Sequence, residues 1–148
     1  MLREAGATVT ETRADTAAVA LGERPLIAER AGAHLFISVH NNAFPDGVNP
    51  FENNGTATFY NNPQSAALAG ALQHALVAEL GLRDLGVALA DLAVVRPTWM
   101  PSALTETMFL MVPEQENALR DPGVQTRIAR AHALAIEAFL RAQVLPPD

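Results

Sequence analysis

The segment from Leu35 to His40 constrains the fold of this chain more than any other, because apolar side chains stand on both of its faces. Its sequence, Leu-Phe-Ile-Ser-Val-His, lacks the alternation of polar and apolar residues that marks a strand with one face in water. A strand that is buried on both sides needs cover on both sides of its sheet. The segment therefore predicts a sheet covered by helices.

The segments before this strand have the order expected of a parallel sheet. Thr8 to Arg13 is predicted to be a short strand, and Leu21 to Ala31 has helical spacing with Gly32 as its stop. A strand, a helix and a second strand form the unit of a parallel sheet, because parallel strands need a long crossover connection. Later strands are predicted over three segments, which are Gly55 to Tyr60, Val87 to Val95 and Ser102 to Phe109.

The clearest helix signal follows residue 61. Asn62 is a residue type that caps helices, Pro63 suits the first helical position, and Gly81 suits the end. Between them, leucines recur at every fourth position and form one apolar stripe. The stripe consists of Leu68, Leu72, Leu76 and Leu80.

A second long helix is predicted to begin at Asp121 and Pro122, and the proline pair at 146–147 is expected to close it. Its apolar side consists of Val124, Ile128, Ala131, Ala135 and Phe139. No internal repeat or low-complexity tract interrupts these elements. One domain over residues 1–148 is therefore expected.

The composition limits the classes of function. Of 148 residues, 49% are hydrophobic and 18% are charged, which is ordinary for a globular domain. The 16 acidic and 10 basic residues give a formal charge of −6, which disfavours binding to nucleic acid or to an anionic membrane. No segment approaches the roughly 20 apolar residues of a membrane span, and no signal peptide is recognised. Because the chain has no cysteine, any zinc would be held by histidine and carboxylate.

Of the four histidines, three have ordinary structural explanations. His74 and His132 fall within the predicted helices, where an exposed or hydrogen-bonded histidine is far commoner than a metal ligand. His34 stands at the boundary of a strand. His40 ends the buried strand, and ligands and catalytic groups gather at the carboxyl ends of strands in open α/β sheets. His40 is therefore a candidate functional residue.

Glu106 lies inside the apolar run from Ala103 to Leu110. An unpaired carboxylate in such a run would cost several kcal/mol to bury. Two interpretations are open for it. Either Glu106 forms an ion pair with Arg13 or Arg96, or it faces a cleft and a metal.

Two further features lie close to these residues in the sequence. Asn41 to Asn54 is the longest irregular stretch and directly follows His40, so it is the place to look for a segment that gates a site. Trp99 shortly precedes Glu106. It either stacks on a sugar or peptide at the rim of a cleft or packs its own turn against the sheet.

Motifs along nearly the whole chain follow the order of one known family. They are Leu2 to Arg30, with its run from Leu2 to Arg13 followed by Leu21 and Arg24, then Phe36 to Ala43, Gly55 to Tyr60, the helix from Ser65 to Leu80, Asp84 to Val87, Asp91 to Arg96, and Met100 to Glu106. The ordered set resembles the zinc-dependent N-acetylmuramoyl-L-alanine amidase family, the amidase type 3 catalytic domain. Leu85 departs from the pattern, because the family commonly has arginine there in an Asp-Arg-Gly-Val motif.

The resemblance implies an α/β fold of three layers, in which a mostly parallel twisted sheet is covered by helices, as in phosphorylase/hydrolase-like domains. It also implies that residues 1–148 form a catalytic domain that is incomplete at its N-terminus, because the first strand and part of the first helix are lacking. An exposed sheet edge invites pairing between chains, so self-association is expected.

The resemblance further implies zinc as the cofactor and peptidoglycan as the partner. It makes His40 a zinc ligand and Glu106 the catalytic carboxylate, and it places the remaining zinc ligands upstream of Met1. Zinc with three protein ligands lowers the pKa of a bound water toward about 7. The bond that this family implies is the amide between the lactyl group of N-acetylmuramic acid and the L-alanine of the stem peptide.

More than one function stays open on the sequence. The leading hypothesis is a peptidoglycan amidase of the periplasm or cell wall, although one imidazole holds zinc poorly, so this chain alone is expected to be inactive. The alternative is a catalytically inactive amidase-like module that binds peptidoglycan or regulates another hydrolase. Another zinc hydrolase, such as a carboxypeptidase, would need an arginine for the substrate carboxylate, for which Arg96 is the candidate.

Overall fold

One four-stranded sheet forms the centre of the computed structural model, which describes residues 1–144. Its strands, in order across the sheet, are β1 (Phe36–Asn42), β4 (Ser102–Phe109), β2 (Thr56–Tyr60) and β3 (Asp84–Leu89). β1 runs parallel to β4 and β2 runs parallel to β3, whereas β4 and β2 are antiparallel. The sheet is therefore mixed, with one antiparallel junction between two parallel pairs.

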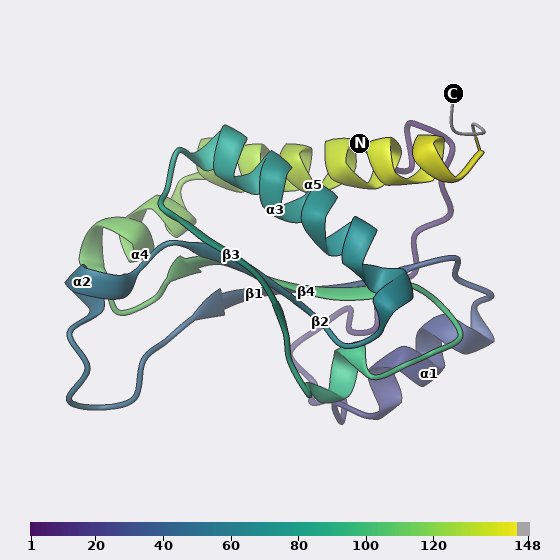
Figure 1. Cartoon of the computed structure of the whole chain (residues 1–148), viewed down its shortest axis with the longest axis horizontal. Helices are drawn as coiled ribbons and strands as arrows, with labels where there is room; N and C mark the ends of the chain where they lie inside the picture. Colours follow the sequence, from purple (N-terminus) through teal and green to yellow (C-terminus); the bar gives the residue numbers. More distant parts are fainter. Residues whose placement is uncertain (145–148) are drawn as a thin grey trace.

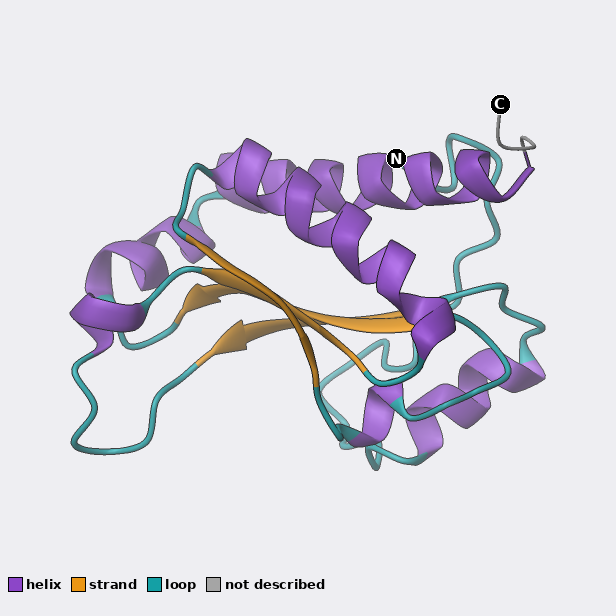
Figure 2. Cartoon of the chain, viewed as in Figure 1, coloured by secondary structure: helices purple, strands orange, loops and turns teal. Residues whose placement is uncertain are grey.

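Helices cover both faces of this sheet (Figure 1, Figure 2). They are α1 (Glu23–Arg30), α2 (Pro50–Asn53), η1 (Pro63–Ser65), α3 (Ala66–Leu80), η2 (Ala93–Val95), α4 (Pro113–Arg120) and α5 (Pro122–Val144), where η marks a 3₁₀ helix. α3 and α5 lie on one face and α1 and η2 on the other (Figure 1). The α/β fold of three layers is confirmed.

The side chains of β4 show why both faces need cover, because they alternate between two cores. Ala103 belongs to one hydrophobic cluster with Leu72 of α3 and Phe139 of α5. Leu104 belongs to another with Ala28 of α1. Leu72 is 0% exposed, and burying a side chain of that size contributes about 1.5–3 kcal/mol. The helices on both sides are therefore part of what holds β4 in place.

Two strand predictions differ from the structure. Thr8 to Arg13 is irregular, and no strand of residues 1–144 lies beside it to complete its hydrogen bonds. The prediction of a strand as the first element of the strand–helix–strand unit is therefore wrong. The strand predicted over Val87 to Val95 lies earlier, because the chain leaves the sheet after Leu89 and its valines at 94 and 95 are buried in the cluster with α1.

The helix ends are partly as predicted. Gly81 ends α3 with a φ of 69°, a left-handed conformation that glycine adopts readily. Asn62 does not cap the helix, because its side-chain amide instead donates to the carbonyl oxygens of Arg96 and Pro97, at 3.0 Å each. The long helix predicted from Pro122 is α5, and the prolines at 146–147 lie outside the described residues.

The outer edge of β1 faces no other strand within the described chain. Self-association through an exposed sheet edge stays a prediction. As for membranes, none of the described helices combines the length and the apolar composition needed to cross one.

His132 of α5 is buried and joins the helix to the central strand. Its Nδ1 lies 2.8 Å from the carbonyl oxygen of Ile128, and its Nε2 lies 2.9 Å from Oγ1 of Thr105 in β4. A carbonyl oxygen only accepts, so Nδ1 carries the proton and Nε2 of the neutral ring accepts from the Thr105 hydroxyl. Burial lowers the pKa of His132, which keeps the ring neutral.

This burial makes the stability of the fold depend on pH. An unfolded histidine binds a proton below its ordinary pKa of about 6.5, but folded His132 resists protonation, so the free energy of unfolding should fall as pH is lowered from 7 to 5. His132→Gln removes this titration, so its stability should vary less over that range. Urea unfolding at each pH measures the difference, and exposed His74→Gln is the control. Equal pH dependence in His132→Gln and the wild type would contradict the assignment.

Candidate functional site

The structure brings His40 and Glu106 side by side. They are register partners on the adjacent parallel strands β1 and β4, so their side chains leave the same face of the sheet. Leu104 and Phe36 share that face and pack toward α1. Two residues that lie 66 positions apart in the sequence thus form one pair at the α1 side of the sheet.

Glu106 occupies this position without a partner. Its Oε2 is buried and forms no hydrogen bond in the described structure. Burial raises the pKa of Glu106 to about 7, because the charged form loses its water. The ion-pair interpretation is wrong for Arg96, which instead bonds Asp91 at 2.6 Å, and neither Arg96 nor Arg13 pairs with Glu106 among residues 1–144.

His40 is half-buried and has a lowered pKa. Burial is the larger cause, and the positive charge of Arg24 in α1 is the second. The ring is therefore neutral at neutral pH, which is the form that binds metals and accepts protons. Sequence reasoning named Arg24 only as part of the family motif and gave it no role. The available signal was its position four residues before Ala28, on the side of the helix that packs against the sheet.

Hydrogen bonds around the end of β1 hold His40 in position. The Thr107 hydroxyl of β4 donates to the side chain of Asn41 and lies 3.4 Å from the carbonyl oxygen of His40. The register then shifts between His40 and Asn42, and the amide of Leu110 donates to the carbonyl oxygen of Asn42 at 2.9 Å. Such irregularities re-aim side chains at strand ends.

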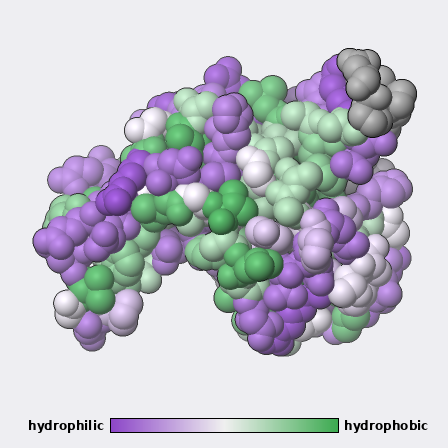
Figure 3. All heavy atoms as spheres, in the orientation of Figure 1, coloured by the Kyte–Doolittle hydropathy of each residue, from purple (hydrophilic) through white to green (hydrophobic). Residues whose placement is uncertain are grey.

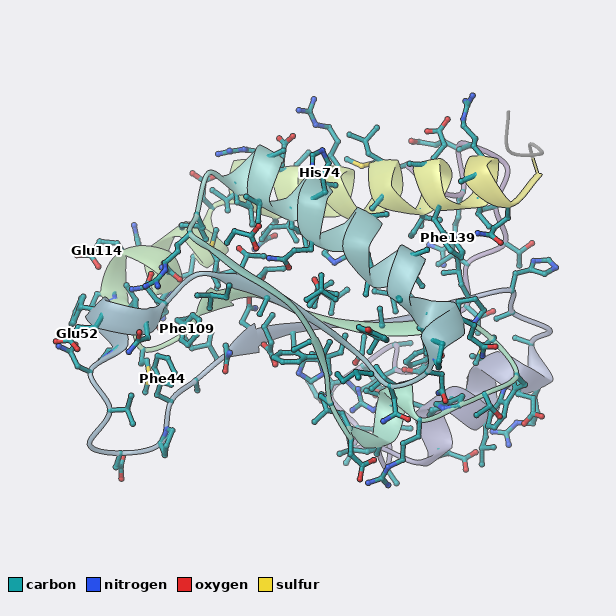
Figure 4. All side chains as sticks on the ribbon, viewed as in Figure 1. Phe44, Glu52, His74, Phe109, Glu114 and Phe139 are labelled. Atoms are coloured by element: carbon teal, nitrogen blue, oxygen red, sulfur yellow. The ribbon has the colours of Figure 1, made fainter. Side chains whose placement is uncertain are left out.

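The stretch from residue 43 to residue 54 is attached at both ends beside this part of the sheet. Phe44 stacks on Phe109 with ring centroids 4.7 Å apart, and Figure 4 shows the two rings together. At the other end, Gln115 of α4 donates to the side chain of Asn54 at 2.8 Å. Figure 3 shows the molecular outline hollowed between this stretch and the side that carries α1. Gating by the stretch stays a prediction.

The other residues that the sequence singled out lie elsewhere. His34 and His74 are exposed and His132 is hydrogen-bonded in the core, as their ordinary explanations predict. Trp99 lies before the first residue of β4, Ser102. Glu106 is the fifth residue of that strand, so it lies roughly 13 Å beyond Ser102 at about 3.3 Å per residue. Trp99 is 52% exposed and lines a shallow hollow with the start of α1, so it does not border Glu106.

The side chains near His40 show how much of a zinc site this chain provides. His40 is neutral and supplies an imidazole nitrogen, which fits one position of a zinc site. Within the part of the chain that the structure describes, no three histidine, aspartate or glutamate side chains converge to hold a metal. His40 is thus at most one ligand, and these residues do not complete the site.

Comparison with known proteins gives a consistent result. The family model described as N-acetylmuramoyl-L-alanine amidase matches residues 1–138. The N-acetylmuramoyl-L-alanine amidase LytC of Bacillus subtilis is 35% identical over 134 residues, which are 88% of this chain and 26% of LytC. The endolysin of Bacillus phage SPP1 is 32% identical over 126 residues, which are 80% of this chain and 44% of the endolysin. The chain spans less than half the length of either relative.

Solved structures agree with the sequence relatives. The catalytic domain of CwlV, an N-acetylmuramoyl-L-alanine amidase from Bacillus (Paenibacillus) polymyxa, has a TM-score of 0.86 and 31% identity. It is matched over 95% of this chain and 76% of its own length. The amidase AmiC2 of Nostoc punctiforme has a TM-score of 0.86 and 29% identity, with the same 95% and 76% coverage. The fold described above is therefore that of these catalytic domains.

The raised pKa of Glu106 predicts how its removal changes stability. Because the folded pKa of about 7 exceeds the ordinary value of 4.5, the stability that the protonated group contributes is lost as pH rises from 4.5 through 7. Glutamine cannot ionise, so the variant escapes this loss. The free energy of unfolding of Glu106→Gln, taken relative to the wild type, should therefore be higher at pH 8 than at pH 5. Urea unfolding at both pH values tests this, with Glu114→Gln in α4 as an exposed control. An effect of Glu106→Gln that is the same at both pH values would refute the assignment.

Proposed function

This chain belongs to the N-acetylmuramoyl-L-alanine amidase family, and from that premise we propose that it forms part of a site that cleaves peptidoglycan. The bond we propose is the amide between the lactyl group of N-acetylmuramic acid and the L-alanine of the stem peptide. One observation carries the proposal. The neutral imidazole of His40 stands beside the buried, unpartnered carboxyl group of Glu106.

Glu106 is proposed to be the group that moves protons in this hydrolysis. A carboxyl group whose pKa is about 7 is ionised in half of the molecules at neutral pH, and it regains a proton as readily as it loses one. It accepts a proton from the attacking water and returns it to the amine nitrogen of L-alanine as the carbon–nitrogen bond breaks. The products are the lactyl carboxylate and a peptide with a free amino terminus.

His40 is proposed to be one ligand of a zinc ion. Zinc, when bound, activates a water and polarises the scissile carbonyl. Because residues 1–144 supply only part of such a site, the remaining ligands are proposed to come from outside them. The contribution of the chain itself is the neutral imidazole, held at the strand end by the Thr107 and Asn41 contacts.

Peptidoglycan as substrate places the activity at the cell wall. A curated relative in Bacillus anthracis, 34% identical over 121 residues, is named an uncharacterized cell wall amidase. We propose the same location for this chain. The formal charge of −6 agrees with a carbohydrate and peptide substrate better than with nucleic acid.

Replacing Glu106 should slow hydrolysis strongly. In the longest in-frame product that contains this chain, Glu106→Gln should slow peptide release from purified peptidoglycan by about 10²–10⁴-fold, because general acid and base catalysis is lost. Chromatography with amino-terminal analysis measures the rate and identifies the bond. Glu114→Gln is the matched control and should leave the rate unchanged.

Two results would overturn the proposed function. One is release at the wild-type rate by Glu106→Gln. The other is a released peptide that does not begin with L-alanine, which would mean that another bond is cut. Zinc-free protein that binds cell walls without releasing peptide would support the inactive module instead.

Zinc binding tests the role of His40 separately. His40→Ala should weaken the zinc affinity of the longest in-frame product at least tenfold, because an imidazole ligand is removed. Competition with a chromogenic chelator measures the affinity. His74→Ala removes an exposed histidine from α3 and should have no effect. Equal affinity in His40→Ala and His74→Ala would exclude His40 as a ligand.

A further inference from the structure

The backbone pairing of β4 becomes irregular on both edges just beyond Glu106. Its antiparallel register with β2 covers Leu104 to Glu106 and ends there, opposite Ala57. On the other edge, toward β1, the register shifts between His40 and Asn42. Contacts other than backbone ladders therefore help to decide how the strand continues past Glu106.

Side chains on the opposite face of the sheet supply such contacts. Thr56 of β2 donates from its Oγ1 to the carbonyl oxygen of Thr107 at 3.0 Å. The Thr107 hydroxyl donates in turn to the side chain of Asn41 in β1. Thr107 is the residue after Glu106, so its side chain leaves the other face of the sheet. Asn41 is likewise the residue after His40, and the two bonds thus join the neighbours of both site residues.

Gln73 of α3 extends this hydrogen-bond network to the far edge of the sheet. Its Nε2 donates to the carbonyl oxygen of Thr56 at 2.7 Å and to Oδ1 of Asp84 in β3 at 2.6 Å. Its Oε1 accepts from the Thr58 hydroxyl at 2.8 Å, so both donor hydrogens and the acceptor of the amide are used. Gln73 is 4% exposed and Thr107 is 1% exposed, so water competes little for these bonds.

We propose that this network positions Glu106 relative to His40, and that Thr56 is the positioning residue that connects β4 to α3. The inference rests on the proposed function. A group that takes a proton from water has to lie within hydrogen-bond reach of it, and a displacement of about 1 Å can cost roughly 10²-fold in rate. A buried network with its polar groups satisfied makes the strands that it joins rigid. The face of the sheet opposite the pair thus carries part of the geometry of the site.

Thr56→Val tests this inference, because valine has nearly the shape of threonine and lacks the hydroxyl. In the longest in-frame product, the variant should lower kcat for hydrolysis of a soluble N-acetylmuramoyl peptide about tenfold and leave KM within twofold. The reason is that the groups that react are kept and only their placement is loosened. Thr56→Ser retains the hydroxyl and should bring kcat back to within twofold of the wild type.

Thr58→Val is the matched control. Thr58 and Thr56 lie on the same face of β2 and both are 0% exposed, but the Thr58 hydroxyl donates to Gln73 rather than to β4. The two valine variants should lower the midpoint of urea unfolding to a similar extent, because each loses one buried hydrogen bond. Thr58→Val should keep kcat within twofold of the wild type. A difference in kcat between variants of similar stability separates positioning from a merely structural role.

A second measurement needs no turnover. The NMR signals of the His40 ring in zinc-free protein, identified as those missing from His40→Ala, should shift in Thr56→Val and stay in place in Thr58→Val. If Thr56→Val does not fold, Thr107→Val breaks the next bond of the network, toward Asn41. It should lower kcat about tenfold and shift the His40 signals, and Thr107→Ser should reverse both effects.

The outcomes separate this inference from the function on which it rests. If the wild type releases peptide and folded Thr56→Val does so with the same kcat, the positioning role is overturned and the proposed function stands. An equal loss of kcat in Thr58→Val, or no recovery in Thr56→Ser, would also overturn it, because the loss would then reflect general destabilisation. Absence of peptide release by the wild type would count against the proposed function, and the positioning role would fall with it.

Discussion

The central strand β4 is the constraint on which the rest of the structure depends. It is hydrogen-bonded to β1 on one edge and to β2 on the other, and it is buried on both faces. The same strand carries Glu106, whose Oε2 has no hydrogen-bond partner in the described residues. The hydrophobic clusters on both sides, with α1 and with α3 and α5, have to offset the desolvation of that carboxyl group. A strand held this firmly can keep an unfavourable group at a candidate site.

Burial acts on His40 and Glu106 in opposite directions, and this is what gives the pair its chemistry. It disfavours the charged form of each group, so the pKa of the histidine falls and the pKa of the glutamate rises to about 7. Near neutral pH, the imidazole is uncharged, with one ring nitrogen unprotonated, and the carboxyl group exchanges a proton easily. Burial, the larger cause at His40 and the cause at Glu106, thus leaves the imidazole in the form that binds metals and leaves the carboxyl group able to exchange a proton near neutral pH.

Sequence patterns predicted the elements whose burial is local. The run from Leu35 to His40 gave β1, the leucine stripe gave α3, and proline followed by apolar spacing gave α5. The strand prediction for Thr8 to Arg13 was wrong because a strand forms only where another strand pairs with it. The strand propensity of a segment does not show whether such a partner exists. Asn62 failed as a cap because its amide found carbonyl groups 34 and 35 residues away, a tertiary contact that local pattern does not encode.

The candidate site was predictable in its residues and not in its arrangement. His40 and Glu106 stood out because polar groups at buried strand positions are rare, but the register that pairs them depends on how β1 aligns with β4. Arg24 was named only as part of the family motif, since an arginine in a short helix is ordinary until α1 is placed under the sheet. The pairing of a neutral imidazole with a carboxyl group of raised pKa thus comes from the register of β1 and β4, and neither segment alone encodes it.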